Sequence, residues 1–262
     1  MSDLESKLRA LTPAQRELLQ RTLARKRGAA EPAADAQAPL TDTEDQWFAL
    51  SSEQLARWAQ YRLRPSEQGS HNNVFAARVH GAIDPQRLSA ALAALLRRHP
   101  MLRARIGEHE GEPAQRIQAQ VGDALRIVDA SGLSQTQLRD RVAEDALRAF
   151  DLDRPPLLRA CVYQTGADAA VLMIAFDHIA GDGWSYWRLL QELGELLGAA
   201  APAAAQAPPA GGYSQRVRQQ REWLQGADAQ RQYEYWSAQL AGDLQALPLP
   251  ADAPRPARGG GR

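Results

Sequence analysis

The feature that most constrains the fold is an apolar run from Val171 to Phe176 that stops abruptly at Asp177-His178. A short loop with two glycines follows, and the residues from Ser185 to Leu197 then have the apolar spacing of a helix. A short apolar run bounded by turn residues is typical of a buried strand. The sequence therefore predicts a strand, a loop and a helix, in which the strand fixes the position of His178 and the loop exposes its ring.

Helix and strand patterns continue along the rest of the chain. Asp84-Pro85 opens a helix with leucines on one face and basic residues at its end. Helices are predicted at residues 52–61, 84–99, 134–149, 185–197, 213–225 and 229–240. Strands are predicted at residues 74–79, 101–106, 114–117, 156–164 and 169–176.

Changes in composition divide the chain into four parts. Residues 1–27 are predicted to be a short helical leader, with Thr12-Pro13 as a helix start. Residues 28–49 are rich in Ala, Pro and Asp and are predicted to be a linker. Residues 50–246 form the main domain, and residues 247–262 form a Pro/Gly-rich tail.

The charge balance excludes several classes of partner. Lys+Arg and Asp+Glu are both 31 among 262 residues, so no net field favours nucleic acid or an anionic membrane. No apolar run reaches the length of about 20 residues that crosses a bilayer. Cys161 is the single cysteine, which excludes an internal disulfide and fits a cytoplasmic protein.

The unit at residues 171–185 resembles the His-His-x-x-x-Asp-Gly motif of the condensation domains of nonribosomal peptide synthetases and related acyltransferases, with Asp177 in place of the first histidine. Other segments are similar to further motifs of that family, in the family's order: residues 50–58, 98–106, 150–160, 220–224, 235–242 and 249–256. The chain ends soon after the last of these. We therefore expect residues 50–246 to be the N-terminal lobe only of a condensation-type domain.

The resemblance implies an α/β fold: a chloramphenicol-acetyltransferase-like lobe with helices packed mainly on one face of a mixed β-sheet. It implies that the complete domain forms an amide bond between acyl or aminoacyl thioesters in antibiotic or other secondary metabolite biosynthesis. No bound cofactor is expected, because phosphopantetheine is delivered by the partner carrier protein. The expected partners are that peptidyl or acyl carrier protein and the missing second lobe or an adjacent synthetase subunit.

His178 matches the family's catalytic histidine. The resemblance implies that its imidazole takes a proton from the acceptor amine or orients that amine, roles that suit a side chain which titrates near neutral pH. The alternative is a histidine that serves only structure at a strand end. Asp177 is expected to accept hydrogen bonds from the loop, and its charge would raise the pKa of His178 if the two side chains are close.

The same motif implies supporting roles for its other residues. Asp182 is expected to pair with an arginine, either Arg103 or Arg57, or with a residue of the second lobe. Gly183 is expected to allow a positive φ or a close backbone approach to substrate. Further support is expected from Arg103, from Trp184 as a packing residue, and from Ser185.

The remaining reactive side chains are assigned to structure. His99 lies at a helix end, where a cation interacts well with the helix dipole. Cys161 is expected to be a small buried hydrophobe. No metal site is expected, because the other histidines, His71, His80 and His109, lack metal-ligand spacing.

Two other functions remain open from the sequence. One is a stand-alone or split acyltransferase of the same superfamily. The other is a non-catalytic truncated lobe that docks a carrier or partner protein.

Overall fold

The computed structural model describes residues 45–198 and 212–242. The predicted leader, most of the predicted linker and the predicted tail lie outside these residues. The helices are α3 (Ser52–Leu63), α4 (Pro85–Arg98), α5 (Gln135–Leu147), α6 (Gly183–Gly198), α7 (Tyr213–Leu224) and α8 (Ala227–Gln239). The strands are β1 (Trp47–Ala49), β2 (Asn72–His80), β3 (Ala104–His109), β4 (Glu112–Ile117), β5 (Leu125–Asp129), β6 (Leu158–Gly166) and β7 (Ala169–Asp177).

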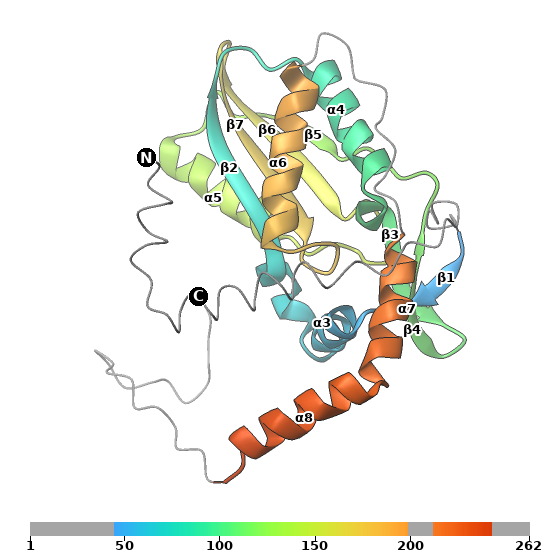
Figure 1. The fold of residues 1–262 in the computed structure, drawn as a ribbon. Coiled ribbons are helices and arrows are strands. Elements are labelled where there is room, and N and C mark those ends of the chain that lie inside the picture. The colour runs from blue at the N-terminus through green and yellow to red at the C-terminus, as the bar shows by residue number, and fades with distance from the viewer. Residues whose placement is uncertain (1–44, 199–211, 243–262) are drawn as a thin grey trace, which may run out of the picture. The chain divides into compact units, whose positions relative to one another are not determined.

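The larger sheet has four strands in the order β2-β7-β6-β5, shown at the centre of Figure 1. β7 pairs antiparallel with both β2 and β6, whereas β5 pairs parallel with β6, so the predicted mixed sheet is confirmed. β7 is therefore an inner strand, with Asp177 opposite Asn72 and Phe176 opposite Leu158. Burial of both of its faces explains the unbroken apolar run in the sequence.

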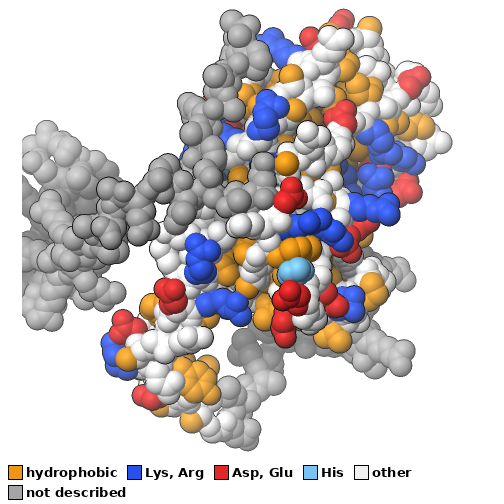
Figure 2. Space-filling model, turned by 90° about the vertical axis from the view of Figure 1, so that its right-hand side faces the viewer, with side chains coloured by type: hydrophobic (Ala, Val, Ile, Leu, Met, Phe, Trp, Pro, Cys, Tyr) orange, Lys and Arg blue, Asp and Glu red, His pale blue; other side chains and the backbone are white. Residues whose placement is uncertain are grey.

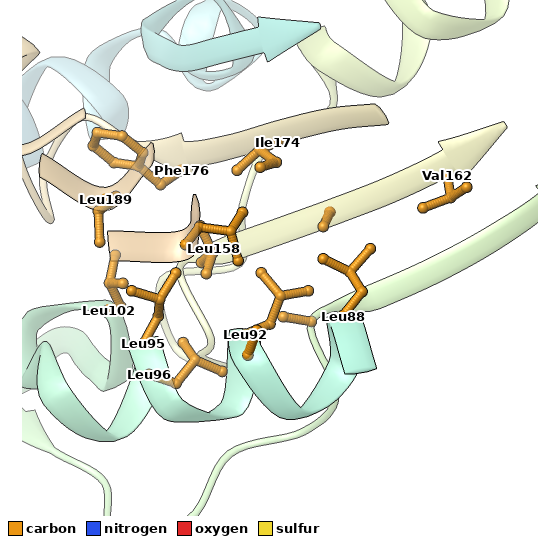
Figure 3. Close-up of a cluster of buried hydrophobic side chains, with 14 of the residues drawn as sticks. Leu88, Leu92, Leu95, Leu96, Leu102, Leu158, Val162, Ile174, Phe176 and Leu189 are labelled. Atoms are coloured by element: carbon orange, nitrogen blue, oxygen red, sulfur yellow. The ribbon is translucent and has the colours of Figure 1, made fainter. Parts of the chain in front are cut away.

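Helices α4 and α6 cover one face of this sheet side by side. Leucines spaced along α4 pack on alternate residues of β6 and β7, and Leu189 of α6 adds to the same cluster. Figure 3 shows the side chains that α4, α6 and the strands contribute to this cluster: Leu88, Leu92, Leu95, Leu96, Leu158, Val162, Ile174, Phe176 and Leu189. This arrangement fixes the start of α6 next to the end of β7.

The opposite face of the sheet is also covered, which corrects the expectation that helices pack mainly on one face. Cys161 and Met173 alternate with the residues of the first cluster and form a second core with Leu138 and Val142 of α5. Tyr61 of α3 and strand residues of the smaller sheet complete this core. The alternation of strand side chains supplies apolar groups to both faces, so both faces need cover. The predicted burial of Cys161 is confirmed.

The smaller sheet has three strands in the order β1-β4-β3. Its β3–β4 hairpin turns at Gly111, which has a positive φ. The predicted strand at residues 101–106 begins only at Ala104, because Pro100–Arg103 forms a 3-10 turn. β1 was not predicted; its three residues pair with β4 and lead directly into α3.

Candidate functional site

His178 lies directly after β7, at the start of the loop that leads to α6. Its half-buried side chain lines a cavity of about 640 Å³, together with residues from the start of α3, the end of α4 and the start of α6. Among the described residues, none forms a hydrogen bond or ion pair with the imidazole. Both ring nitrogens are therefore available to a molecule that enters the cavity.

Asp177 holds the loop from the other side. By strand alternation its side chain faces the second core, where it is 0% exposed. One carboxylate oxygen accepts hydrogen bonds from the Tyr61 hydroxyl and from the Ile179 amide, each at 2.9 Å. Burial raises the pKa of Asp177, and these hydrogen bonds and the nearby Arg57 charge only partly offset this. Asp177 thus has the loop-supporting contacts expected of it.

A glutamine pair provides the second anchor of the loop. Gln54 of α3 donates to the carbonyl of Ile179 at 3.1 Å and exchanges hydrogen bonds with the fully buried Gln115 of β4. Gln115 also donates to the carbonyl of Ala49. Ser51 and Gln54 form a capping box that fixes the first turn of α3. The loop beside His178 is therefore tied to both sheets and to α3.

Asp182 caps the helix that leaves the site. Its carboxylate accepts hydrogen bonds from the Ser185 amide at 2.9 Å and from the Ser185 hydroxyl at 2.8 Å. These bonds lower the pKa of Asp182. The carboxylate is therefore a helix cap in this structure, where the sequence had predicted an arginine pair. This contact also gives Ser185 its supporting position.

The two arginines proposed as partners of Asp182 have other contacts. Arg103 is buried beside the 3-10 turn and donates to the carbonyls of Leu96, Gln118 and Ala119. It does not line the cavity. Arg57 does line the cavity, and it donates to Gln60 and to the Nδ1 atom of His71.

The glycines of the loop differ in what they require. Gly183 has no positive φ, so the expectation of a positive φ there is wrong. A Cβ at Gly183 would meet no described atom within 4 Å. Gly181 was not predicted to matter, yet a Cβ there would lie 2.9 Å from the Ser185 side chain and 3.2 Å from Phe176. Within the described residues, packing therefore disfavours a side chain at position 181 but leaves room for one at position 183.

Trp184 was expected to be a packing residue. It is 85% exposed, so it does not pack into the core formed by the described residues. Trp187, one turn further along α6, is 66% exposed. Residues three apart on a helix lie on the same side. The start of α6 therefore carries two exposed tryptophans directly after the loop of His178.

A buried carboxylate, Glu192, contacts three side chains that line the cavity. Glu192 of α6 is 2% exposed and contacts His99 Nε2 at 2.7 Å, Arg98 Nε at 3.3 Å and Arg188 Nε. Burial alone would raise the pKa of Glu192, but the hydrogen bonds from Arg188 and His99 and the Arg98 charge outweigh it and lower the pKa. His99 therefore does more than face a helix dipole, because it joins α4 to α6.

The three partners of Glu192 all line the cavity that contains His178. Glu192 was not predicted from the sequence, although the sequence carries a signal for it. Glu192 lies among the apolar positions of α6, and the basic end of α4 supplies a cluster of cations that a buried acid needs.

The described residues contain no group of three or more His, Cys, Asp or Glu side chains that would hold a metal ion. Nor do they include a helix with the length and apolar character needed to cross a membrane. Figure 2 shows basic, acidic and hydrophobic side chains interspersed on one face of the molecule. The site combines three features: an accessible imidazole, a loop fixed by buried hydrogen bonds, and a cavity lined by charged side chains.

The chain is similar to known proteins over most of its length. Residues 44–260 match the family model of the condensation domain. The chain is 34% identical over 221 residues to one of the linear gramicidin synthase proteins of Brevibacillus parabrevis, covering 81% of this chain and 3% of that protein. It is 32% identical over 263 residues to phosphinothricin tripeptide synthetase of Streptomyces viridochromogenes, covering 98% of this chain and 24% of that protein. The chain thus spans a small part of these relatives.

Solved structures show the same fold. A four-domain nonribosomal peptide synthetase bound to AMP and glycine matches with a TM-score of 0.66 at 27% identity, covering 85% of this chain and 17% of that chain. The first condensation domain of the calcium-dependent antibiotic synthetase matches with a TM-score of 0.64 at 22% identity, covering 74% of this chain and 48% of that chain. The expected chloramphenicol-acetyltransferase-like α/β fold is confirmed, and the chain belongs to the condensation-domain family of nonribosomal peptide synthetases.

Proposed function

We propose that residues 50–246 are the N-terminal lobe of a condensation domain that forms an amide bond between two carrier-bound thioesters, with His178 acting on the acceptor amine. The observation that carries this proposal is the position of His178. Its imidazole lines the cavity, is free of hydrogen bonds to the described residues, and follows a strand and a loop held by several buried contacts.

The chemistry needs few groups from this lobe. The amine nitrogen attacks the thioester carbonyl, a C–N bond forms, the C–S bond breaks, and the proton lost by nitrogen ends on the thiolate. An imidazole nitrogen within hydrogen-bond reach orients the amine and accepts that proton. The rest of the acceleration comes from holding the two reactants in line, which the walls of the cavity support.

No cofactor need be resident in such a site, because each substrate arrives on the phosphopantetheine arm of a carrier protein. The partners in this proposal are therefore the peptidyl or acyl carrier protein and a second lobe. The solved condensation domain compared above is about twice as long as the part matched by this chain, since the match covers 48% of it. In this arrangement the second lobe supplies the other wall of the cavity.

The test is amide formation between donor-loaded and acceptor-loaded carrier proteins, with this lobe completed by the second lobe of its synthetase. His178→Ala is expected to lower the rate by about 10²–10⁴-fold, the usual effect of a lost general base. His80→Ala is the matched control, because His80 is exposed at the opposite end of β2 from the site. An unchanged rate in His178→Ala would exclude the role of His178 and favour a lobe that only docks its partners.

A further inference from the structure

The cavity beside His178 is lined by three arginines, and they differ in how their charge is balanced. Arg98 and Arg188 both contact the buried carboxylate of Glu192. Arg57 makes no ion pair with a carboxylate in the described ranges 45–198 and 212–242. The acids that line the same cavity are engaged elsewhere: Glu53 accepts from Gln220, and Asp182 caps α6.

The hydrogen bonds of Arg57 leave most of its guanidinium unused. Both bonds come from Nη1, to Gln60 Oε1 at 3.3 Å and to His71 Nδ1 at 3.0 Å. Because an arginine can only donate, His71 accepts here as a neutral ring. Nε and Nη2 have no partner among the described residues, and neither is a fully buried atom. Three N–H groups of Arg57 therefore remain available at the cavity.

Arg57 also lies within electrostatic range of the catalytic loop. Its positive charge acts on Asp177, and burial together with the Arg57 charge lowers the pKa of His71. The Asp177 carboxylate makes no direct ion pair or hydrogen bond with Arg57 in the structure; its hydrogen bonds come from Tyr61 and Ile179. A half-buried guanidinium without an acid partner is stabilised when an anion enters beside it.

We propose that Arg57 is a specificity-determining residue, which selects a substrate whose acyl or aminoacyl group carries a carboxylate. This inference rests on the proposed function, because it assumes that the cavity receives the acyl end of a pantetheine thioester. The planar guanidinium donates two parallel hydrogen bonds to the carboxylate, which a neutral side chain cannot match. No covalent step is involved, so Arg57 acts on binding and orientation.

The test compares two stable pantetheine thioethers that differ in one group, a 3-carboxypropyl chain and a 3-carbamoylpropyl chain. Binding to the full chain is measured by isothermal titration calorimetry, with histidine NMR signals reporting whether the ligand reaches the cavity. The carboxylate ligand is expected to bind about tenfold or more tightly than the amide, as charged hydrogen bonds to an arginine do. Arg57→Gln is expected to abolish that difference, and Arg57→Lys to retain part of it.

The control is Arg62→Gln on the same helix. Arg62 is largely exposed, pairs with Glu108 and does not line this cavity, so its loss should leave the preference intact. Equal binding of both ligands to the parent chain would overturn the specificity of Arg57 while leaving the proposed function standing. Failure of both ligands to bind would count against the cavity as a pantetheine site and so against both proposals.

Discussion

Asp177 is fully buried, whereas the side chain of its neighbour His178 lines a cavity. The aspartate has taken a position where the family motif has a histidine, and it keeps two hydrogen bonds to the loop. Its other oxygen is buried without a partner among the described residues. Substitutions at position 177 can therefore show whether a buried negative charge there affects the stability of the protein.

Asp177→Asn removes the ionisable carboxyl of residue 177 and keeps the size of its side chain. Because burial raises the folded-state pKa of Asp177, its ionisation opposes folding. The stability that this carboxyl contributes is complete below its unfolded pKa, about 3.9, and is lost as the pH rises through the higher folded value. Urea unfolding should therefore show Asp177→Asn gaining stability relative to the parent chain from pH 4 to pH 7.

Asp177→Ala is the comparison for that experiment. It leaves the Tyr61 hydroxyl and the Ile179 amide without their acceptor, and should cost about 2 kcal/mol in the free energy of unfolding. A difference between Asp177→Asn and the parent chain that is the same at every pH would show that the pKa of Asp177 is not raised in the folded state.

At the scale of elements, the long periodic segments were predictable, whereas strands β1 and β5 were not predicted. The strand before His178 and helices such as α4 follow from apolar spacing, because each buries a continuous face. β1 has three residues, too few for any period to show, and it exists because β4 offers it a pairing edge. β5 shows weak alternation and is held by parallel pairing with β6, a contact between distant segments.

The candidate site shows the same division. The motif places His178, Asp182 and Ser185, which are close in sequence. Contacts from distant elements, such as Tyr61 with Asp177 and Gln54 with Ile179, could not be derived from spacing, because they depend on how α3 crosses the end of the sheet. The exposure of Trp184 was missed for a related reason: an apolar residue after a loop resembles a core residue until its neighbours are known.

Ion pairs of Glu192 with Arg98 and His99 join α6 to the end of α4. Glu192→Gln removes the charge and leaves Arg98, Arg188 and His99 facing a neutral amide, so the free energy of unfolding at neutral pH should fall by about 3 kcal/mol. Since the folded pKa of Glu192 is lowered, this contribution is present above its unfolded pKa and is lost as the pH falls through the folded value. The two proteins should therefore become similar in stability in strong acid.

Glu195→Gln is the matched control on the same helix, because Glu195 is exposed and accepts only from Gln191 among the described residues. It should change the stability by less than about 0.5 kcal/mol. Equal effects of the two substitutions in chemical denaturation would mean that the buried ion pairs do not hold α4 against α6.

At the scale of the whole molecule, large apolar side chains remain exposed beside the site and along the last two helices. Trp184 and Trp187 of α6 are the most exposed tryptophans of the described ranges, and Tyr233, Tyr235 and Trp236 of α8 are each more than half exposed. Exposed apolar surface of this kind marks sites where another surface packs. In the proposed function, the second lobe covers the tryptophans of α6, which follow the catalytic loop directly.

This cover can be tested with Trp184→Ser/Trp187→Ser. Without a second lobe, the parent chain should self-associate as its concentration rises, because uncovered tryptophans favour contact with one another or with a second copy. The double variant should stay closer to the monomer mass in multi-angle light scattering. Leu63→Ser/Leu147→Ser is the control, since these leucines are exposed on other elements, at 81% and 61%.

Adding the second lobe should suppress self-association of the parent and shift its tryptophan emission to shorter wavelength. A parent chain that stays monomeric at high concentration, with emission unchanged by the second lobe, would place the lobe contact somewhere other than the start of α6.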